Sequence, residues 1–91
     1  MDIAVLRQQI DAIDKEMVEL FCKRMKIASG IADYKKEKGL PVHVPAREAE
    51  VLEKVSQMAD AEFSEDVKVF YQAIFEISRT HQQKRNAEVT K

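Results

Sequence analysis

This sequence has few residues that interrupt helices and strands or that cross-link the chain. Two glycines and two prolines among 91 residues argue against a sandwich or barrel, because such folds need many turns. The single cysteine, Cys22, excludes an internal disulfide and a multi-cysteine zinc site, and it suits a reducing compartment. We therefore expect a cytoplasmic protein without disulfides.

Long apolar runs and an excess of either charge are missing as well. The longest unbroken apolar run covers residues 3–6, which is too short for a membrane span or for the apolar region of a signal peptide. Fifteen basic residues against sixteen acidic ones give a net charge of −1, and this balance does not indicate a nucleic-acid partner. We expect a protein that binds neither membranes nor nucleic acid.

The apolar residues that are present recur at helical spacing. Along residues 3–38 they lie three and four positions apart, which predicts one long helix that packs along a continuous apolar seam. Gly39 and Pro41 then mark the end of this helix. The seam positions are Ile3, Leu6, Ile10, Ile13, Met17, Leu20, Ile27, Ile31 and Tyr34.

Two shorter helices follow. One is expected over about residues 45–60 and opens with Pro45, which suits the first helical position. The other is expected over about residues 65–85, with a polar tail at residues 86–91. The sequence thus predicts a single all-α domain of three helices over residues 1–91.

The first helix is too long for the rest of the chain. Its 36 residues form a rod about 54 Å long, whereas a compact domain of this size has a radius of gyration near 12 Å. The two remaining helices cannot bury so long an apolar seam. We therefore expect a second copy of the chain to bury the rest of it, in an intertwined (domain-swapped) helical-bundle homodimer.

Two cationic residues lie close to this seam. Counting helical steps from Leu20 places Arg24 where an apolar residue belongs, and Lys35 follows about 20° around the helix and about 16 Å along it. Burying an unpaired guanidinium is costly. Arg24 therefore either fixes the helix register, reaches solvent along its apolar stem, or binds an anion inside the bundle. Lys35 either contributes to that anion site or is only a charged residue at the end of the helix.

The third helix also carries polar residues where apolar ones belong. Its apolar stripe leads to Ser78 and then Gln82, four residues apart on one face. A hydroxyl and an amide that face the core need hydrogen-bond partners. Those partners are each other, water near the helix end, or a ligand. The stripe consists of Val67, Tyr71 and Ile74.

Further fixed charges lie near the starts of the first two helices. Arg7 is close to the start of the first helix, and Arg47 and Glu48 are close to the start of the second. The latter two could equally form a solvated surface pair. Nothing with metal-ligand spacing surrounds the two histidines, His43 and His81, so we expect no metal site.

In combination, these residues resemble the all-helical class of chorismate mutases, of the short monofunctional type. The resemblance covers about residues 3–85, and its motifs are specific because they occur in the right order and spacing. They comprise residues 6–14, Arg24 within residues 22–25, residues 32–36, residues 39–42 with Arg47 and Glu48, and Ser78 with Gln82. The resemblance implies a domain-swapped helical dimer that rearranges chorismate to prephenate in aromatic amino-acid biosynthesis.

The resemblance also implies how the two carboxylates of chorismate are held. Arg7 of the partner subunit and Lys35 would hold the enolpyruvyl carboxylate. Arg24, with help from Ser78 and Arg47, would hold the ring carboxylate. No cofactor is implied, because a [3,3] rearrangement needs neither proton transfer nor a covalent intermediate.

The remaining implied contacts concern the ring hydroxyl and the ether oxygen. Glu48 would accept a hydrogen bond from the hydroxyl, and the catalytic residues Lys35 and Gln82 would donate to the ether oxygen. The family usually has an aspartate before Pro45, where it caps the second helix. This sequence has Val44 there, which leaves Glu48 with more of the hydroxyl contact.

Two other functions fit the same sequence. An isochorismate-pyruvate lyase of the same fold acts on a substrate with the hydroxyl elsewhere on the ring, so Glu48 favours the mutase. A non-catalytic helical dimer, either a regulatory module that binds an aromatic-pathway enzyme or a plain dimerisation domain, explains the long seam but not the inward polar residues. Another enzyme of that pathway is a candidate partner of the chain.

Overall fold

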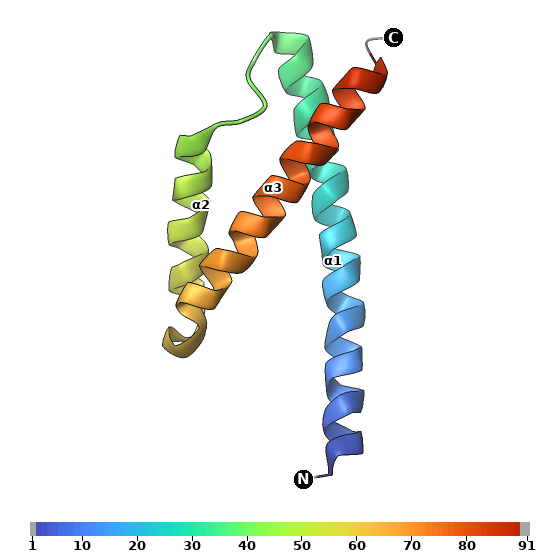
Figure 1. The fold of residues 1–91 in the computed structure, drawn as a ribbon, viewed down its shortest axis with the longest axis vertical. Coiled ribbons are helices and arrows are strands. Elements are labelled where there is room, and N and C mark those ends of the chain that lie inside the picture. The colour runs from blue at the N-terminus through green and yellow to red at the C-terminus, as the bar shows by residue number, and fades with distance from the viewer. Residues whose placement is uncertain (1, 90–91) are drawn as a thin grey trace.

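Three helices make up the chain. The computed structural model describes residues 2–89, with side chains described as far as Asn86. Helix α1 spans Ile3–Lys38, α2 spans Pro45–Met58 and α3 spans Ser64–Val89, with a short 3₁₀ turn, η1, at Ala61–Phe63 (Figure 1). Residues 2–89 contain no strand, so the all-α prediction is confirmed.

The end of α1 follows directly from its sequence. Gly39 adopts a left-handed backbone with φ 69°, which glycine does at little cost. The N–H of Gly39 donates to the Lys36 carbonyl, and the N–H of Leu40 donates to the Lys35 carbonyl over 2.7 Å. These two bonds satisfy carbonyls that the helix itself leaves unpaired, so α1 ends at Lys38 as expected.

The other helix ends differ from the expected ones by a few residues. Helix α2 ends at Met58 rather than near residue 60, because Ala59 adopts extended backbone and Asp60, with ψ 141°, is not helical either. Helix α3 continues past the expected end at residue 85 to Val89, since residues 86–89 contain neither glycine nor proline to stop it. Residues 90 and 91 of the expected tail lie outside the described residues.

Helix α3 forms the centre of the fold. It packs against α2 along its first half and crosses the second half of α1 (Figure 1). Ala28 and Ala32 lie four residues apart on α1 and are both buried, so small side chains let the two helices approach closely where they cross. The buried apolar residues are Ala28, Ala32, Val55, Ile74 and Phe75.

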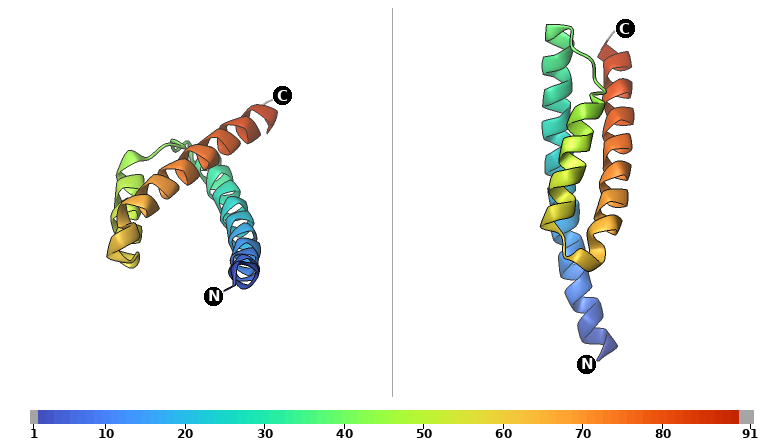
Figure 2. Two further views of the ribbon diagram at one scale, coloured as in Figure 1. Left: turned by 60° about the horizontal axis from the view of Figure 1, so that its bottom comes forward. Right: turned by 90° about the vertical axis from the view of Figure 1, so that its left-hand side faces the viewer.

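The first half of α1 projects away from the other two helices (Figure 2). The chain measures 55 × 27 × 15 Å with a radius of gyration of 16.4 Å, well above the value of about 12 Å for a compact domain of this length. The six seam residues from Ile3 to Leu20 are all exposed, Ile10 by 57%. One chain therefore does not cover this seam. Despite its length, α1 is not apolar enough to cross a membrane, and neither is any other helix within residues 2–89.

Candidate active site

A pocket of about 320 Å³ opens where the second half of α1, the start of α2 and the second half of α3 meet. This volume lies at the lower end of the range for small-molecule sites. Its apolar lining consists of Ile27, Ala28, Ile31, Val42, Val44, Val51 and Phe75. Its polar lining consists of Arg24, Lys35, Arg47, Glu48, Ser78, Arg79 and Gln82.

The polar lining carries a strong excess of positive charge. Four of its side chains are cationic and only one is a carboxylate, although the whole chain has a net charge of −1. A pocket with apolar walls concentrates the field of such charges on a bound ligand. The arrangement suits a small molecule that bears more than one negative charge.

Arg24 turns into the pocket rather than out to solvent. Its guanidinium carbon lies 5.8 Å from the ring centroid of Tyr71 and 5.7 Å from that of Phe75, so the two rings stabilise the cation through their π faces. In the part of the chain that the structure describes, no carboxylate pairs with Arg24. Its N–H donors are therefore well suited to bind an anionic ligand.

Lys35 and Gln82 each bond a backbone carbonyl at the pocket wall. Lys35 Nζ donates to the Val42 carbonyl, and Gln82 Nε2 donates to the Ala28 carbonyl, both over 3.2 Å. An ammonium group has three donors and an amide has two. Each bond therefore orients its side chain while leaving at least one N–H for a ligand.

Among the residues whose side chains the structure describes, Ser78 is the one buried polar residue, with 7% of its surface exposed. Its Oγ lies 3.6 Å from Met25 Sδ, a weak acceptor, and it lines the pocket. The prediction that Ser78 faces the interior is confirmed. Ser78 and Gln82 do not bond each other, because the amide of Gln82 bonds α1 instead.

Glu48 and Arg47 are neighbours on α2 with different surroundings. The side chain of Glu48 is 25% exposed, and its Oε2 accepts a hydrogen bond from Arg79 Nη1, while His43 Nε2 lies 3.5 Å from its Oε1. Arg47 Nη1 bonds Glu50 Oε1 over 2.8 Å, with both side chains more than half exposed. Arg47 therefore lies at the rim of the pocket in a surface pair, whereas Glu48 belongs to its wall.

Arg7 does not reach the pocket of its own chain. It is exposed on the projecting half of α1, 17 residues and so about 26 Å along the helix from Arg24. The other six predicted site residues all line the one pocket. They are Arg24, Lys35, Arg47, Glu48, Ser78 and Gln82.

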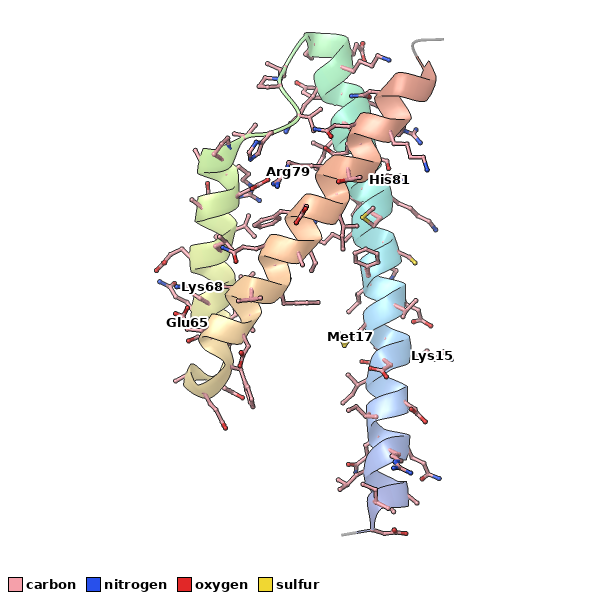
Figure 3. All side chains as sticks on the ribbon, in the orientation of Figure 1. Lys15, Met17, Glu65, Lys68, Arg79 and His81 are labelled. Atoms are coloured by element: carbon pink, nitrogen blue, oxygen red, sulfur yellow. The ribbon has the colours of Figure 1, made fainter. Side chains whose placement is uncertain are left out.

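Arg79 lines the pocket and was missed by the sequence analysis. Figure 3 shows its side chain on the side of α3 that faces α2. Phe75, Arg79 and Gln82 are four and three residues apart, which puts all three on one face of the helix. That spacing could have indicated Arg79, because Phe75 is buried and Gln82 is a candidate residue.

An ion pair beyond the pocket joins the ends of α1 and α3. Arg85 donates from Nε to Asp33 Oδ1 over 3.2 Å and from Nη2 to Asp33 Oδ2 over 3.0 Å. This fork geometry is the favourable one for arginine and a carboxylate. The hydrogen bond from Arg85 lowers the pKa of Asp33.

Comparison with known proteins identifies several relatives, two of which are named as chorismate mutases. The chain is 40% identical over 57 residues to a bifunctional chorismate mutase/prephenate dehydratase of Aquifex aeolicus, covering 63% of this chain and 16% of that protein. It is 37% identical over 60 residues to the T-protein of Enterobacter agglomerans, covering 66% of this chain and 16% of that protein. It is 29% identical over 56 residues to a chorismate mutase of Methanocaldococcus jannaschii, covering 62% of this chain and 57% of that protein.

The family match is broader than any of these pairwise matches. No solved structure matches the chain significantly. The sequence matches the family described as chorismate mutase type II over residues 6–83. This range includes all of α2, most of α1 and α3, and every residue that lines the pocket. The chain therefore belongs to the chorismate mutase type II family.

Proposed function

We propose that this chain catalyses the [3,3] rearrangement of chorismate to prephenate. The observation that carries the proposal is the pocket between the three helices, which gathers six of the seven expected site residues and is lined by four cations against one carboxylate. Chorismate is a dicarboxylate with a ring hydroxyl and an ether oxygen. The pocket offers a chemically matching group for each of these.

The reaction requires little of the protein beyond positioning and electrostatics. It is unimolecular, so the site must hold the compact chair-like conformer and stabilise the charge that develops on the ether oxygen. A millionfold acceleration corresponds to about 8 kcal/mol, and one preorganised donor can supply about 3–4 kcal/mol. Two donors and the carboxylate contacts are therefore sufficient in magnitude.

In our proposal, cations from two helices hold the carboxylates. Arg24, which lies over the rings of Tyr71 and Phe75, binds the ring carboxylate with help from Ser78 and from Arg47 at the rim. Lys35 binds the enolpyruvyl carboxylate together with Arg7 of the partner subunit. Glu48 accepts a hydrogen bond from the ring hydroxyl.

Lys35 and Gln82 are the proposed catalytic residues. Each keeps one N–H on a backbone carbonyl of α1 or of the segment that follows it, which fixes the side chain before the substrate arrives. A further N–H of each donates to the ether oxygen as its bond to carbon breaks. Donors held in place in advance need no reorganisation during the reaction, which is the condition for strong electrostatic stabilisation.

We also propose that the working enzyme is a domain-swapped homodimer. The bare seam on the first half of α1 supports this, because an apolar face of that length is normally buried against a partner. The position of Arg7 supports it too, since the same half of α1 would carry this residue into the pocket of the second chain. Each active site would then be built from two subunits.

Two further proposals concern the location of the enzyme in the cell and a partner protein. The single cysteine, Cys22, is consistent with the reducing cytoplasm that we propose as its location. One relative is named as a bifunctional chorismate mutase/prephenate dehydratase. By analogy, we propose that a second enzyme of aromatic biosynthesis is a possible partner of this chain.

The direct test follows the loss of chorismate absorbance and identifies the product. The wild-type chain should yield prephenate, and Arg24→Ala should reduce kcat/KM by at least about 100-fold while leaving the helical circular dichroism unchanged. Lys26→Ala removes an exposed cation two residues along the same helix and should keep full activity. A wild-type chain that releases pyruvate from isochorismate but leaves chorismate intact would indicate the lyase instead, and inactivity on both would indicate a non-catalytic module.

A further inference from the structure

The carboxylate in the pocket wall has a partner that the implied site does not include. Glu48 lies on α2 and Arg79 on α3, 31 residues apart in sequence, yet Arg79 Nη1 bonds Glu48 Oε2. Only 28% of the Arg79 side chain and 25% of the Glu48 side chain are exposed. An ion pair buried to this degree has a defined geometry, unlike the exposed pair of Arg47 and Glu50 on the same helix.

We propose that Arg79 is a positioning residue that holds Glu48 for the ring hydroxyl of the substrate. The inference rests on the proposed mutase function. A carboxylate offers about four acceptor sites on its two oxygens, so a bond from Arg79 to Oε2 leaves Oε1 able to accept from the hydroxyl. Without Arg79, the flexible glutamate side chain would have to be ordered when the substrate binds.

Three residues near Glu48 do not hold its carboxylate in place. Val44 also lines the pocket one turn earlier, but it makes no side-chain hydrogen bond at the start of α2. His43 Nε2 is 3.5 Å from Glu48 Oε1, longer than an ordinary hydrogen bond, and its side chain is 50% exposed. Arg47 is turned to Glu50. Arg79 is therefore the one strong donor to Glu48 in the part of the chain that the structure describes.

The test compares Arg79→Met, Glu48→Gln and the double variant by kcat/KM on chorismate. We expect each single change to cost roughly 10- to 100-fold, the scale of a lost charge-assisted hydrogen bond, and the double variant to be no worse than Glu48→Gln alone. Arg79→Lys should recover part of the loss, because its ammonium keeps one bond to Oε2. On a chorismate analogue with hydrogen in place of the ring hydroxyl, Arg79→Met should equal wild type.

Arg85→Met is the matched control, because it removes another arginine of α3 that pairs with a carboxylate on a different helix. It should lower the melting temperature without changing kcat/KM. If the losses of Arg79→Met and Glu48→Gln multiply, or if the loss persists on the analogue, Arg79 touches the substrate itself and the inference is overturned. A lower melting temperature with unchanged kcat/KM would give Arg79 a structural role only. A wild-type chain that is inactive on chorismate would instead refute the proposed function.

Discussion

The position of Arg7 leads to a prediction about mixed dimers. Arg7 lies about 26 Å along α1 from Arg24, far beyond the reach of an arginine side chain, so it cannot serve the pocket of its own chain. If it serves the partner's pocket, two inactive variants can repair each other. Arg7→Ala has an intact pocket but supplies no Arg7, whereas Lys35→Ala has a damaged pocket but supplies Arg7 to the other chain.

The expected recovery follows from counting sites. When the two variants are co-expressed in equal amounts and pair at random, half of the dimers contain one chain of each kind. In such a dimer, one site has both residues and the other has neither. The mixture should therefore recover about a quarter of the wild-type activity. Each parent variant should retain about 1% or less, since each lacks a charged contact to the substrate.

The assay is chorismate decay in the purified mixture, with two different affinity tags to isolate the mixed dimer. A mixture of Lys35→Ala and Gln82→Ala is the control, because both residues belong to the same chain's pocket and no arrangement restores a complete site. Recovery in the control as well would point to contamination. No recovery with Arg7→Ala, in a dimer shown to be mixed, would refute the contribution of Arg7 across the interface.

Three further predictions concern the donor at the ether oxygen, the seam and an ion pair. Gln82→Glu should work best at acid pH and lose activity as pH rises, because an ionised carboxylate cannot donate to the ether oxygen; a flat rate–pH profile with wild-type turnover at pH 8 would contradict this. Ile10 is 57% exposed, so Ile10→Ala should remove about 1.4 kcal/mol of burial per chain and weaken the dimer about 100-fold in sedimentation. Lys15 lies on the other side of α1 from the seam residue Met17 (Figure 3), so Lys15→Ala should leave the dimer unchanged. Arg85 lowers the pKa of Asp33 in the folded state. The ion pair therefore stabilises the fold fully above the unfolded pKa of about 3.9, and this stabilisation is lost as pH falls through the lower folded pKa. Asp33→Asn should thus reduce the melting temperature at pH 7 but not at pH 2, and an equal reduction at both would contradict the electrostatic explanation.

Features encoded by neighbouring residues were predictable from the sequence. The end of α1 is one example, because Gly39 supplies the left-handed backbone and Pro41 follows two residues later. The inward position of Ser78 is another, since it depends only on helical spacing from apolar residues on the same helix. The end of α3 was not predictable in this way, because residues 86–89 carry no stop signal.

Contacts between helices were less accessible to sequence reasoning. Helical spacing from Phe75 and Gln82 could place Arg79 on the pocket side of α3, but it could not reveal the partner, Glu48, which is 31 residues away. Whether the two meet depends on how α2 is rotated against α3, which no local spacing states. Arg47 shows the opposite case. Helical geometry places Glu50 one turn away from it, and this local pair competes with the pocket for its guanidinium.

The uncovered half of α1 would make the behaviour of this chain depend on its abundance. If copies of the chain bury this seam against each other, folding and assembly become a second-order process, and the melting temperature should rise with total chain concentration. Dilution below the dimer dissociation constant would then dismantle active sites as well as dimers. Output per chain would fall steeply when expression is low, so a cell could switch the reaction off by limiting synthesis, without any inhibitor.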